Sequence, residues 1–468
     1  MMTFRAWPGP QSAMKNKTQK TTEGPSLPVL DPRAAGIDVG SERMYVSIGG
    51  GTPRVFETFT RGLNALKDWL VEEGVRTVAM EATGIYWLPL YGILEAARIR
   101  VLVVNGAHIR NLPGRKTDIA DCQWIATLHA HGMLRSGFVP EADIRRLRDY
   151  QRLRDDHIEM AAAHVQHMQK ALERMNVKVH DVLSQITGVS GQRVVRAILG
   201  GERDPERLAD LCDIQVLRRK REPLVESLRG TWVDEHLFGL RQAVAAWDFY
   251  QGQIQECDQQ IEAVLRGMAG TPPPEGEPSP GKPTASKKAG VNAHHIDGLK
   301  DLLVRILGGK DPTVLPSLTH YTLTQLIAEV GTDLSRWPTE KHFTAWLGLA
   351  PGCRQSGKSR RRESRGLGNA GRIFCIAARS IARSTHLALG GFYRRLRALR
   401  GGQVAVMATA RKVAVLFYRM MTRGLAYVEV GMKRYEDQYR EQQIRRTVRV
   451  AKKLGLTVLQ PHSPKPTG

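Results

Sequence analysis

The sequence has few of the features that mark secreted or membrane proteins. It contains five cysteines without any Cys-x-x-Cys pair (Cys122, Cys212, Cys257, Cys353 and Cys375). Their odd number and wide spacing exclude a disulfide framework and a cysteine zinc site, and indicate a reducing compartment. No apolar run reaches the length of a membrane span, and the polar N-terminus lacks the apolar core of a secretory signal. The sequence therefore predicts a soluble, intracellular protein.

Acidic residues are also scarce relative to basic ones. The 468 residues include 46 Asp and Glu against 69 Lys and Arg, a net charge of +23. Such an excess predicts a polyanionic partner, most often nucleic acid. Basic ribosomal and membrane-surface proteins share this property, so the charge alone identifies a class of partner and no activity.

Residues 34–140 predict an α/β domain. The preceding residues 1–33 are polar and lack periodicity, so we expect a loose tail there. From residue 34, apolar runs and helical spacings predict three strands in a meander, followed by helix, strand, helix, strand and helix.

Four acidic residues stand out in this domain. Asp38 lies between Ile37 and Val39 in the first predicted strand, and Glu81 directly follows the apolar run of the fourth. Asp118 and Asp121 lie one turn apart in the helix after the fifth strand, so they face the same way. Like charges at this spacing repel unless a cation lies between them, although aspartate is also common in a first helical turn.

The four carboxylates come from three elements and can converge only around a divalent cation. Two Mg²⁺ ions about 3.5–4 Å apart would activate the attacking oxygen and stabilise the leaving oxygen in phosphodiester chemistry. Asp38 supports this interpretation, because an acid within an apolar strand is costly to bury alone. Glu81 by itself fits a surface strand end equally well. Together, the acids in this order of elements predict a ribonuclease-H-like nuclease core.

The rest of the chain predicts helices, a linker and a second basic region. Residues 141–270 have the periodicity of long amphipathic helices that pack together or across a dimer, as in a coiled coil. Residues 271–291 are rich in Pro, Gly and Ser and predict a flexible linker. We expect a mainly helical C-terminal domain over residues 292–430 and a basic helical tail over 431–468.

The C-terminal domain contains a basic stretch that we interpret as a Gly-containing loop between helices. Around Ser356, seven cations accompany the single acid Glu363: Arg354, Lys358, Arg360, Arg361, Arg362, Arg365 and Arg372. Composition alone favours a loop that contacts phosphates without chemistry. Ser356 could also attack phosphorus, because the surrounding cations would stabilise its alkoxide and the transition state.

Several motifs resemble those of DEDD-type insertion-sequence transposases, recombinases whose core is similar to RuvC-type Holliday-junction resolvases. The N-terminal resemblance covers residues 34–140 and includes GIDVGSE, VAMEATGIYW, LVVNGAHIRNLPGRKTDIADCQWIA and HGMLRSGFVP. It implies that Asp38, Glu81, Asp118 and Asp121 are the metal-binding tetrad. The C-terminal pattern FTAWLGLAP…SGK…GN…R is similar to the domain that carries the family's nucleophilic serine.

The chain departs from the family pattern in two places. Many relatives have two adjacent serines where this chain has Gln355-Ser356, so Ser356 is the aligned nucleophile and Ser359 the fallback. The segment LPSLTHYTLTQ, residues 315–325, replaces a Gly-rich helix-hairpin-helix sequence that contacts phosphates in relatives.

The resemblance implies a recombinase that acts by phosphodiester transesterification. Ser356 would form a transient phosphoserine bond with DNA while the tetrad holds two Mg²⁺ ions at the same phosphate. A structured non-coding RNA from the element would pair with donor and target DNA. We expect nucleic-acid contacts from the basic stretch and from Arg115 and Lys116. We also expect a homo-oligomer, a dimer or a dimer of dimers, in the prokaryotic cytoplasm at the nucleoid.

Two other classes of function remain open. A structure-specific endonuclease, such as a junction resolvase, would use water in place of Ser356 and form no covalent adduct. A non-catalytic nucleic-acid-binding protein would keep the positive charge and have no use for the four acids.

Overall fold

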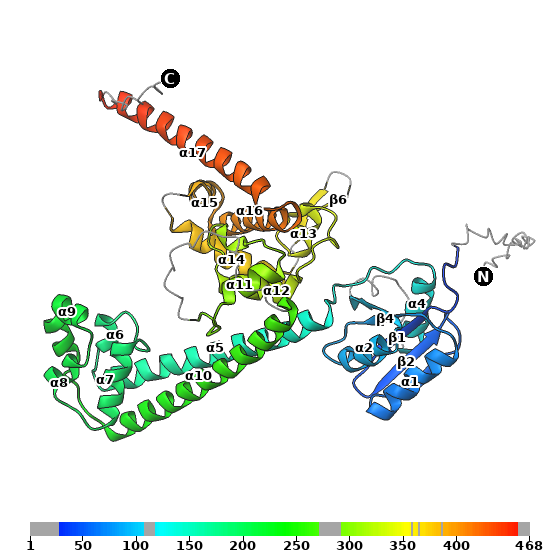
Figure 1. The fold of residues 1–468 in the computed structure, drawn as a ribbon, viewed down its shortest axis with the longest axis horizontal. Helices are drawn as coiled ribbons and strands as arrows, with labels where there is room; N and C mark the ends of the chain where they lie inside the picture. Colours follow the sequence, from blue (N-terminus) through cyan, green and yellow to red (C-terminus); the bar gives the residue numbers. More distant parts are fainter. Residues whose placement is uncertain are drawn as a thin grey trace, which may run out of the picture. The chain divides into compact units, whose positions relative to one another are not determined.

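The computed structural model describes residues 28–106, 118–270, 292–356, 359–363, 366–384 and 387–456. It divides into two compact units, Met1–Val139 and Pro140–Gly468, which are described separately (Figure 1). The first is an α/β unit and the second is almost entirely helical, as the sequence predicts. Most of the predicted tail, residues 1–27, and the predicted linker, residues 271–291, lie outside the described residues. None of the helices described here has the length and apolar character needed to cross a membrane.

The first unit is built on a five-stranded sheet in the order β3-β2-β1-β4-β5. Strands β1, β2 and β3 are antiparallel neighbours, whereas β1, β4 and β5 run parallel. The element order is the predicted one: β1 (Ala35–Val39), β2 (Arg43–Ile48), β3 (Arg54–Glu57), α1 (Thr60–Glu72), β4 (Thr77–Glu81), α2 (Trp87–Ala96), β5 (Arg100–Val104) and α4 (Asp118–Ala130).

The two faces of this sheet are covered by different helices. Alternate residues of β1 and β4, such as Ile37 and Met80, join the main core with the apolar sides of α1 and α2. The other face receives α4, and the approach is close. A Cβ at Gly36 would lie 2.1 Å from the backbone nitrogen of Ala126, so a residue without a side chain is needed there.

The last residues of the predicted tail, where the structure describes them, contact the end of α4. The backbone amides of Leu30 and Asp31 donate to the carbonyl oxygen of Ala130 at 2.8 and 3.1 Å. A ring nitrogen of His131 lies 3.1 Å from the carbonyl oxygen of Pro28. The end of α4 has carbonyl groups without helical partners, and this segment supplies donors to one of them.

The second unit begins with two long helices, α5 (Ala142–Arg174) and α10 (Asp234–Ala269), which lie side by side (Figure 1). Four shorter helices connect them and pack around an apolar core that includes Met168, Leu172 and Leu240. These helices are α6 (Val179–Val182), α7 (Val189–Leu199), α8 (Pro205–Asp210) and α9 (Ile214–Ser227).

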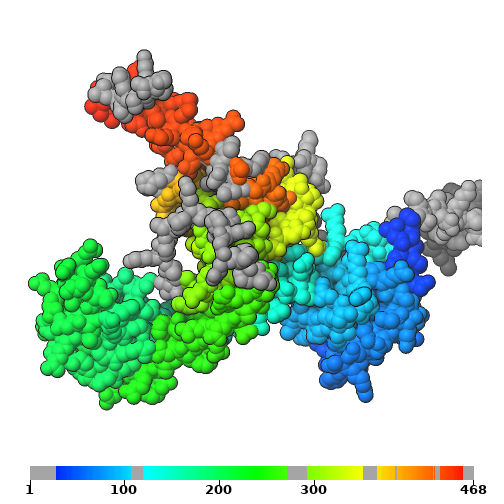
Figure 2. Space-filling view, viewed as in Figure 1, coloured from blue at the N-terminus to red at the C-terminus, as the bar shows by residue number. Residues whose placement is uncertain are grey.

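The C-terminal part of this unit packs around a cluster of aromatic side chains. Phe343, Phe374 and Phe417 are fully buried and contact one another. The elements are α11 (Leu299–Ile306), η1 (Pro312–Val314), α12 (His320–Val330), α13 (Glu340–Trp346), β6 (Gly352–Ser356), β7 (Ser359–Glu363), α14 (Asn369–Ala382), α15 (Ala388–Arg400), α16 (Gly402–Arg423) and α17 (Leu425–Lys453). Figure 2 shows α17, in orange and red, projecting from the rest of the unit.

Candidate catalytic site

Asp38 and Glu81 occupy equivalent positions on neighbouring parallel strands. The β1–β4 register ends with Ile37 opposite Met80, and Asp38 and Glu81 are the next residue of each strand. Since side chains alternate along a strand, both acids belong to the face opposite Ile37 and Met80, which is the face covered by α4. Both are half-buried. The sheet therefore brings together two of the predicted acids.

Asp121 reaches the same region from α4. It is half-buried and precedes Cys122, whose side chain is buried against the sheet. Burial and the nearby negative charges of Asp38 and Asp121 together raise the pKa of the Cys122 thiol to about 11. Both carboxylates are therefore close enough to act electrostatically on one thiol. Three predicted acids from β1, β4 and α4 thus gather on one side of the sheet.

Three other predicted residues of this region have side chains that lie outside the described part of the chain. Asp118 is the first residue of α4, one helical turn before Asp121, and its side chain lies outside the described part. Arg115 and Lys116 also lie outside the described residues.

The acids have the chemistry that a hard divalent cation requires. Carboxylate oxygens are the side-chain ligands that Mg²⁺ prefers. Within the described residues, no three His, Cys, Asp or Glu side chains lie close enough together to hold a metal ion. The described part of the site is therefore an incomplete ligand set, and the side chain of Asp118, the remaining predicted ligand, lies outside it.

The predicted basic loop is a β-hairpin, which corrects the sequence interpretation. Strands β6 and β7 are antiparallel, and their register ends with Ser356 opposite Ser359. The sequence signal was the Gly357-Lys358 dipeptide between two five-residue runs, because glycine in the first position favours a two-residue hairpin connection. Arginine and serine are frequent in both runs, and this composition favoured the interpretation as a solvated loop.

The hairpin places like charges opposite each other. Arg354 pairs with Arg361 in the register, and such cross-strand pairs are destabilising unless an anion accompanies them. Arg360 and Arg362 lie on the same strand, β7, whereas Lys358 and Arg365 fall outside the described residues. Arg372 is exposed in the first turn of α14. The hairpin is thus suited to bind a polyanion.

A set of contacts around Glu329 lies at the start of α14, the helix that follows the hairpin. Glu329 of α12 accepts two hydrogen bonds from Arg152 of α5, at 2.9 and 3.0 Å, and one from Asn369 at 3.4 Å. Asn369 begins α14, the helix that follows the hairpin. Contacts over such sequence separations have no local signal, so sequence reasoning missed Glu329.

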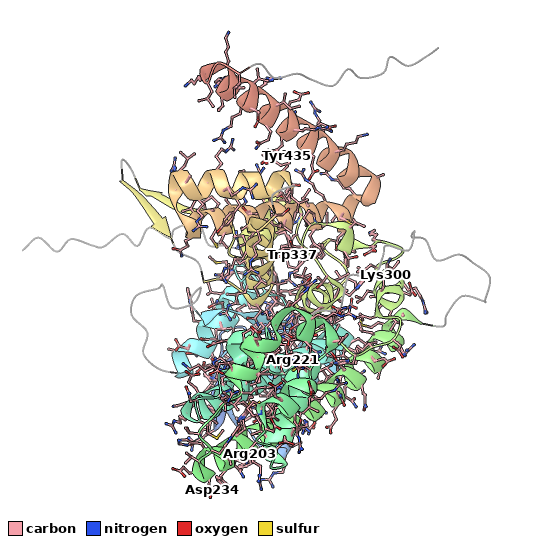
Figure 3. The ribbon with its side chains drawn as sticks, turned by 90° about the vertical axis from the view of Figure 1, so that its left-hand side faces the viewer. Arg203, Arg221, Asp234, Lys300, Trp337 and Tyr435 are labelled. Carbon is pink, nitrogen blue, oxygen red and sulfur yellow. The ribbon has the colours of Figure 1, made fainter. Side chains whose placement is uncertain are left out.

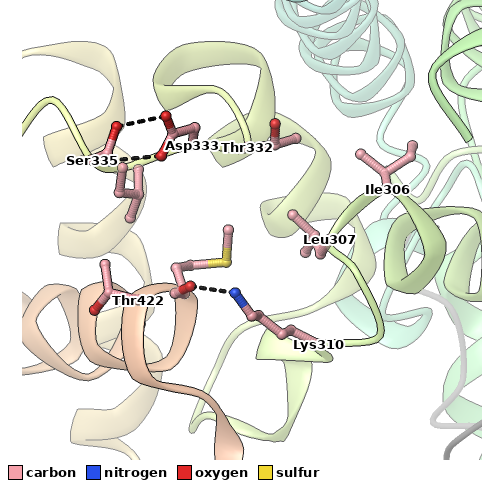
Figure 4. A pocket seen from close by; sticks show the side chains of 9 residues that line it. Ile306, Leu307, Lys310, Thr332, Asp333, Ser335 and Thr422 are labelled. Carbon is pink, nitrogen blue, oxygen red and sulfur yellow. Dashed lines mark hydrogen bonds between the residues drawn. The ribbon is translucent and has the colours of Figure 1, made fainter.

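A pocket of about 450 Å³ lies between the end of α11 and the end of α16 (Figure 4). Its polar groups already have partners. Asp333 accepts hydrogen bonds from Ser335 at 2.8 and 2.6 Å, and the Lys310 ammonium donates to the Met421 carbonyl at 2.5 Å.

Two family models match the chain. One, for DEDD transposases of the IS110 type and described as "Transposase", matches residues 35–177, and the second, described as "Transposase IS116/IS110/IS902 family", matches residues 314–394. The first match contains the acidic site and the second contains the hairpin. The chain is therefore a DNA-cleaving and rejoining enzyme, the transposase of an insertion sequence. In particular, it belongs to the IS110-type family of DEDD transposases. A search of curated proteins found no match.

Proposed function

We propose that this transposase cuts and rejoins DNA with an acidic, Mg²⁺-dependent site in the first unit and a serine nucleophile, Ser356, in the second. The observation that carries the proposal is the adjacency of Asp38 and Glu81 on the sheet face covered by α4. An antiparallel β3-β2-β1 meander continued by parallel β4 and β5 supports a ribonuclease-H-like fold for the first unit.

The acidic residues would hold the metal. Asp38, Glu81 and Asp121 supply carboxylates from three elements, and Asp118 would add a fourth from the start of α4. DEDD-type transposases generally use divalent metal ions. Bound there, Mg²⁺ would neutralise charge at the reacting phosphate and lower the pKa of an attacking hydroxyl. The close approach of α4 to Gly36 keeps Asp121 at a fixed height above the sheet.

Ser356 would carry out the covalent step. Its Oγ would form a bond to phosphorus while the bond from phosphorus to one sugar oxygen breaks, and the hydroxyl proton would pass to a carboxylate or to water. The phosphoserine diester conserves the energy of the broken bond, so the strand can be rejoined to another end. The hairpin arginines around Ser356 would stabilise the extra negative charge of the transition state.

Serine is a poor nucleophile at neutral pH unless a base or metal takes its proton. The hairpin sequence offers only Glu363 among many cations, so activation would come from the acids of the first unit. We propose that these acids belong either to the same chain or to another protomer of a homo-oligomer. The chain's strong positive charge also supports a structured non-coding RNA as the guide that pairs with donor and target DNA.

Trapping the covalent species on labelled DNA tests the serine assignment. Ser356→Ala should abolish the protein–DNA adduct and strand exchange and leave DNA binding nearly unchanged. Ser359→Ala is the matched control, because it removes the hydroxyl directly opposite in the hairpin register. An adduct mapped to Ser359, or cleavage by Ser356→Ala at the full rate, would overturn the assignment. Full-rate cleavage would favour a resolvase-like nuclease that uses water.

A mixing experiment tests whether the two halves act in different subunits. Ser356→Ala and Asp38→Asn are each expected to be inactive alone. If the serine and the acids act in trans, mixed oligomers contain an intact site and recover part of the activity. Without recovery, the two groups act within one chain.

A further inference from the structure

The C-terminal helices contain a long stretch of chain without acidic residues. Residues 364–428 include no Asp or Glu but contain 12 Lys and Arg. Among the described residues, Arg419 pairs with Glu340 of α13. Exposed cations without neighbouring acids repel one another, so this part of the surface favours an anionic partner.

Helix α15 presents much of this charge to solvent. Arg395, Arg397 and Arg400 are exposed along it. Arg394 is exposed as well and donates to the backbone carbonyl of Ser384 at 2.6 Å. The following glycine, Gly401, ends the helix with a positive φ of 86°.

Helix α17 is anchored against α15 and α16 through two tyrosines. A Cβ at Gly391 of α15 would lie 2.3 Å from the ring of Tyr439, so the two helices touch there. Tyr435 lies one turn earlier, and the Lys412 ammonium of α16 is 4.6 Å from its ring centroid. Figure 3 shows Tyr435 between α17 and the body of the domain.

The anchored face of α17 continues as a basic stripe. Tyr435, Tyr439, Gln442, Arg446, Arg449 and Lys453 follow one another at spacings of four and three residues, which places them on one side of the helix. On the opposite side of the helix, Arg440, Ile444, Thr447 and Ala451 follow one another at the same spacings, so no cation follows Arg440 on that side. Three of the cations at the end of α17 therefore lie on the side that docks at α15, while Arg445 and Lys452 lie on its flank.

We propose that α15 and the basic stripe of α17 form a surface that binds the phosphate backbone of duplex DNA. The residues of this α15–α17 surface are Arg395, Arg397, Arg400, Arg446, Arg449 and Lys453. All six are exposed. None of these residues belongs to the hairpin or to the acidic site, and the proposal rests only on the action of a transposase on DNA.

Duplex DNA fits this surface better than duplex RNA. The end of α17 is exposed on all sides from Arg440 onward, apart from the half-buried Ala451. A bare helix about 10–12 Å wide fits the B-form major groove, which is about 12 Å wide. The A-form major groove of RNA is deep and narrow and admits no such helix.

The test measures DNA binding of the full chain without Mg²⁺, so that failure of the catalytic proposal leaves it unaffected. Arg446→Gln with Arg449→Gln should weaken binding of a duplex DNA of arbitrary sequence. It should also reduce the slope of log K against log salt by about 2. The matched control is Lys433→Gln with Arg440→Gln, which removes two cations from the opposite stripe and should change the slope little.

Two further measurements make the outcome decisive. Arg446→Lys with Arg449→Lys keeps the charges and should keep the slope. A duplex RNA of the same length should lose less affinity than DNA when the stripe is neutralised. An equal loss in the opposite-stripe control would show only a general effect of net charge. A loss confined to RNA would overturn the assignment to DNA.

Discussion

Arg154 and Asp258 form an ion pair that is buried in the second unit. The guanidinium Nε lies 2.7 Å from one carboxylate oxygen, and the two side chains are 1% and 2% exposed. Arg154 also donates to the backbone carbonyls of Asn292 and Ala293, and Asp258 accepts from the amide of His295. The pair thus joins α5 and α10 to the first described residues of the C-terminal part.

Breaking this pair is expected to destabilise the protein. Arg154→Met leaves Asp258 charged and buried without its partner, and should lower the free energy of unfolding by about 3–5 kcal/mol. Adding Asp258→Leu should restore much of the loss, because neither charge is then buried. Denaturant unfolding of the full chain measures both. The control is Arg196→Gln, which breaks an exposed pair with Asp248 and should cost less than about 1 kcal/mol.

His294 should make stability depend on pH. Burial, together with the neighbouring Arg154 and His295, lowers its pKa from 6.5 to about 3. Between these values the unfolded chain binds more protons than the folded one, so stability falls as pH decreases below 6.5. The loss from this group should reach about 2 kcal/mol at pH 5.

Comparison of variants isolates this contribution. His294→Gln should flatten the difference in unfolding free energy between pH 7 and pH 5, whereas His295→Gln, at an exposed neighbour, should keep it. An unchanged pH dependence in His294→Gln would show that other groups cause it.

Asp38→Asn and Asp121→Asn should lose catalysis and keep the fold. Each removes a proposed metal ligand and also relieves repulsion between nearby carboxylates, so stability without metal should stay equal or rise. Mg²⁺ should raise the melting temperature of the unaltered protein and affect these variants less. Glu72→Gln, at an exposed acid of α1, is the control and should respond to Mg²⁺ normally. A large loss of stability without metal would mean that the aspartates are structural.

Gly36→Ala should disturb the site through the backbone. The added methyl group would lie within 2.6 Å of the Cys122 carbonyl oxygen and closer still to Ala126, so α4 must move away from the sheet. We expect a loss of about 1–3 kcal/mol and of strand cleavage. Gly92→Ala is the control, because its Cβ meets nothing within 4 Å in α2 and should be neutral or slightly stabilising. Normal cleavage by Gly36→Ala would show that cleavage does not depend on the close packing of α4 against β1.

The first unit was predictable because its signals are local. Alternating and continuous apolar runs predicted the order of elements along the chain, and the acid inside β1 predicted a functional site there. The register explains why Asp38 and Glu81 meet, and this step required knowing that β1 and β4 run parallel. The sequence could not supply that pairing from either strand alone.

The second unit was less accessible to sequence reasoning because its decisive contacts join distant segments. The hairpin was interpreted as a loop, since four arginines and two serines in ten strand residues resemble a solvated connection. Glu329 and the Arg154–Asp258 pair have no sequence signature. Arg152 contacts Glu329 and Arg154 contacts Asp258, and in both pairs the two residues are more than 100 positions apart.

The parallel pairing of β1 with β4 also has a consequence for synthesis of the chain. Asp38 is made early, but its neighbour Glu81 appears only after β2, β3 and α1, and Asp121 appears later still. Such non-local contacts form only after the intervening loop has closed, and domains fold as units once their sequence is complete. The acids that we propose to hold the metal can therefore come together only after α4 has been made.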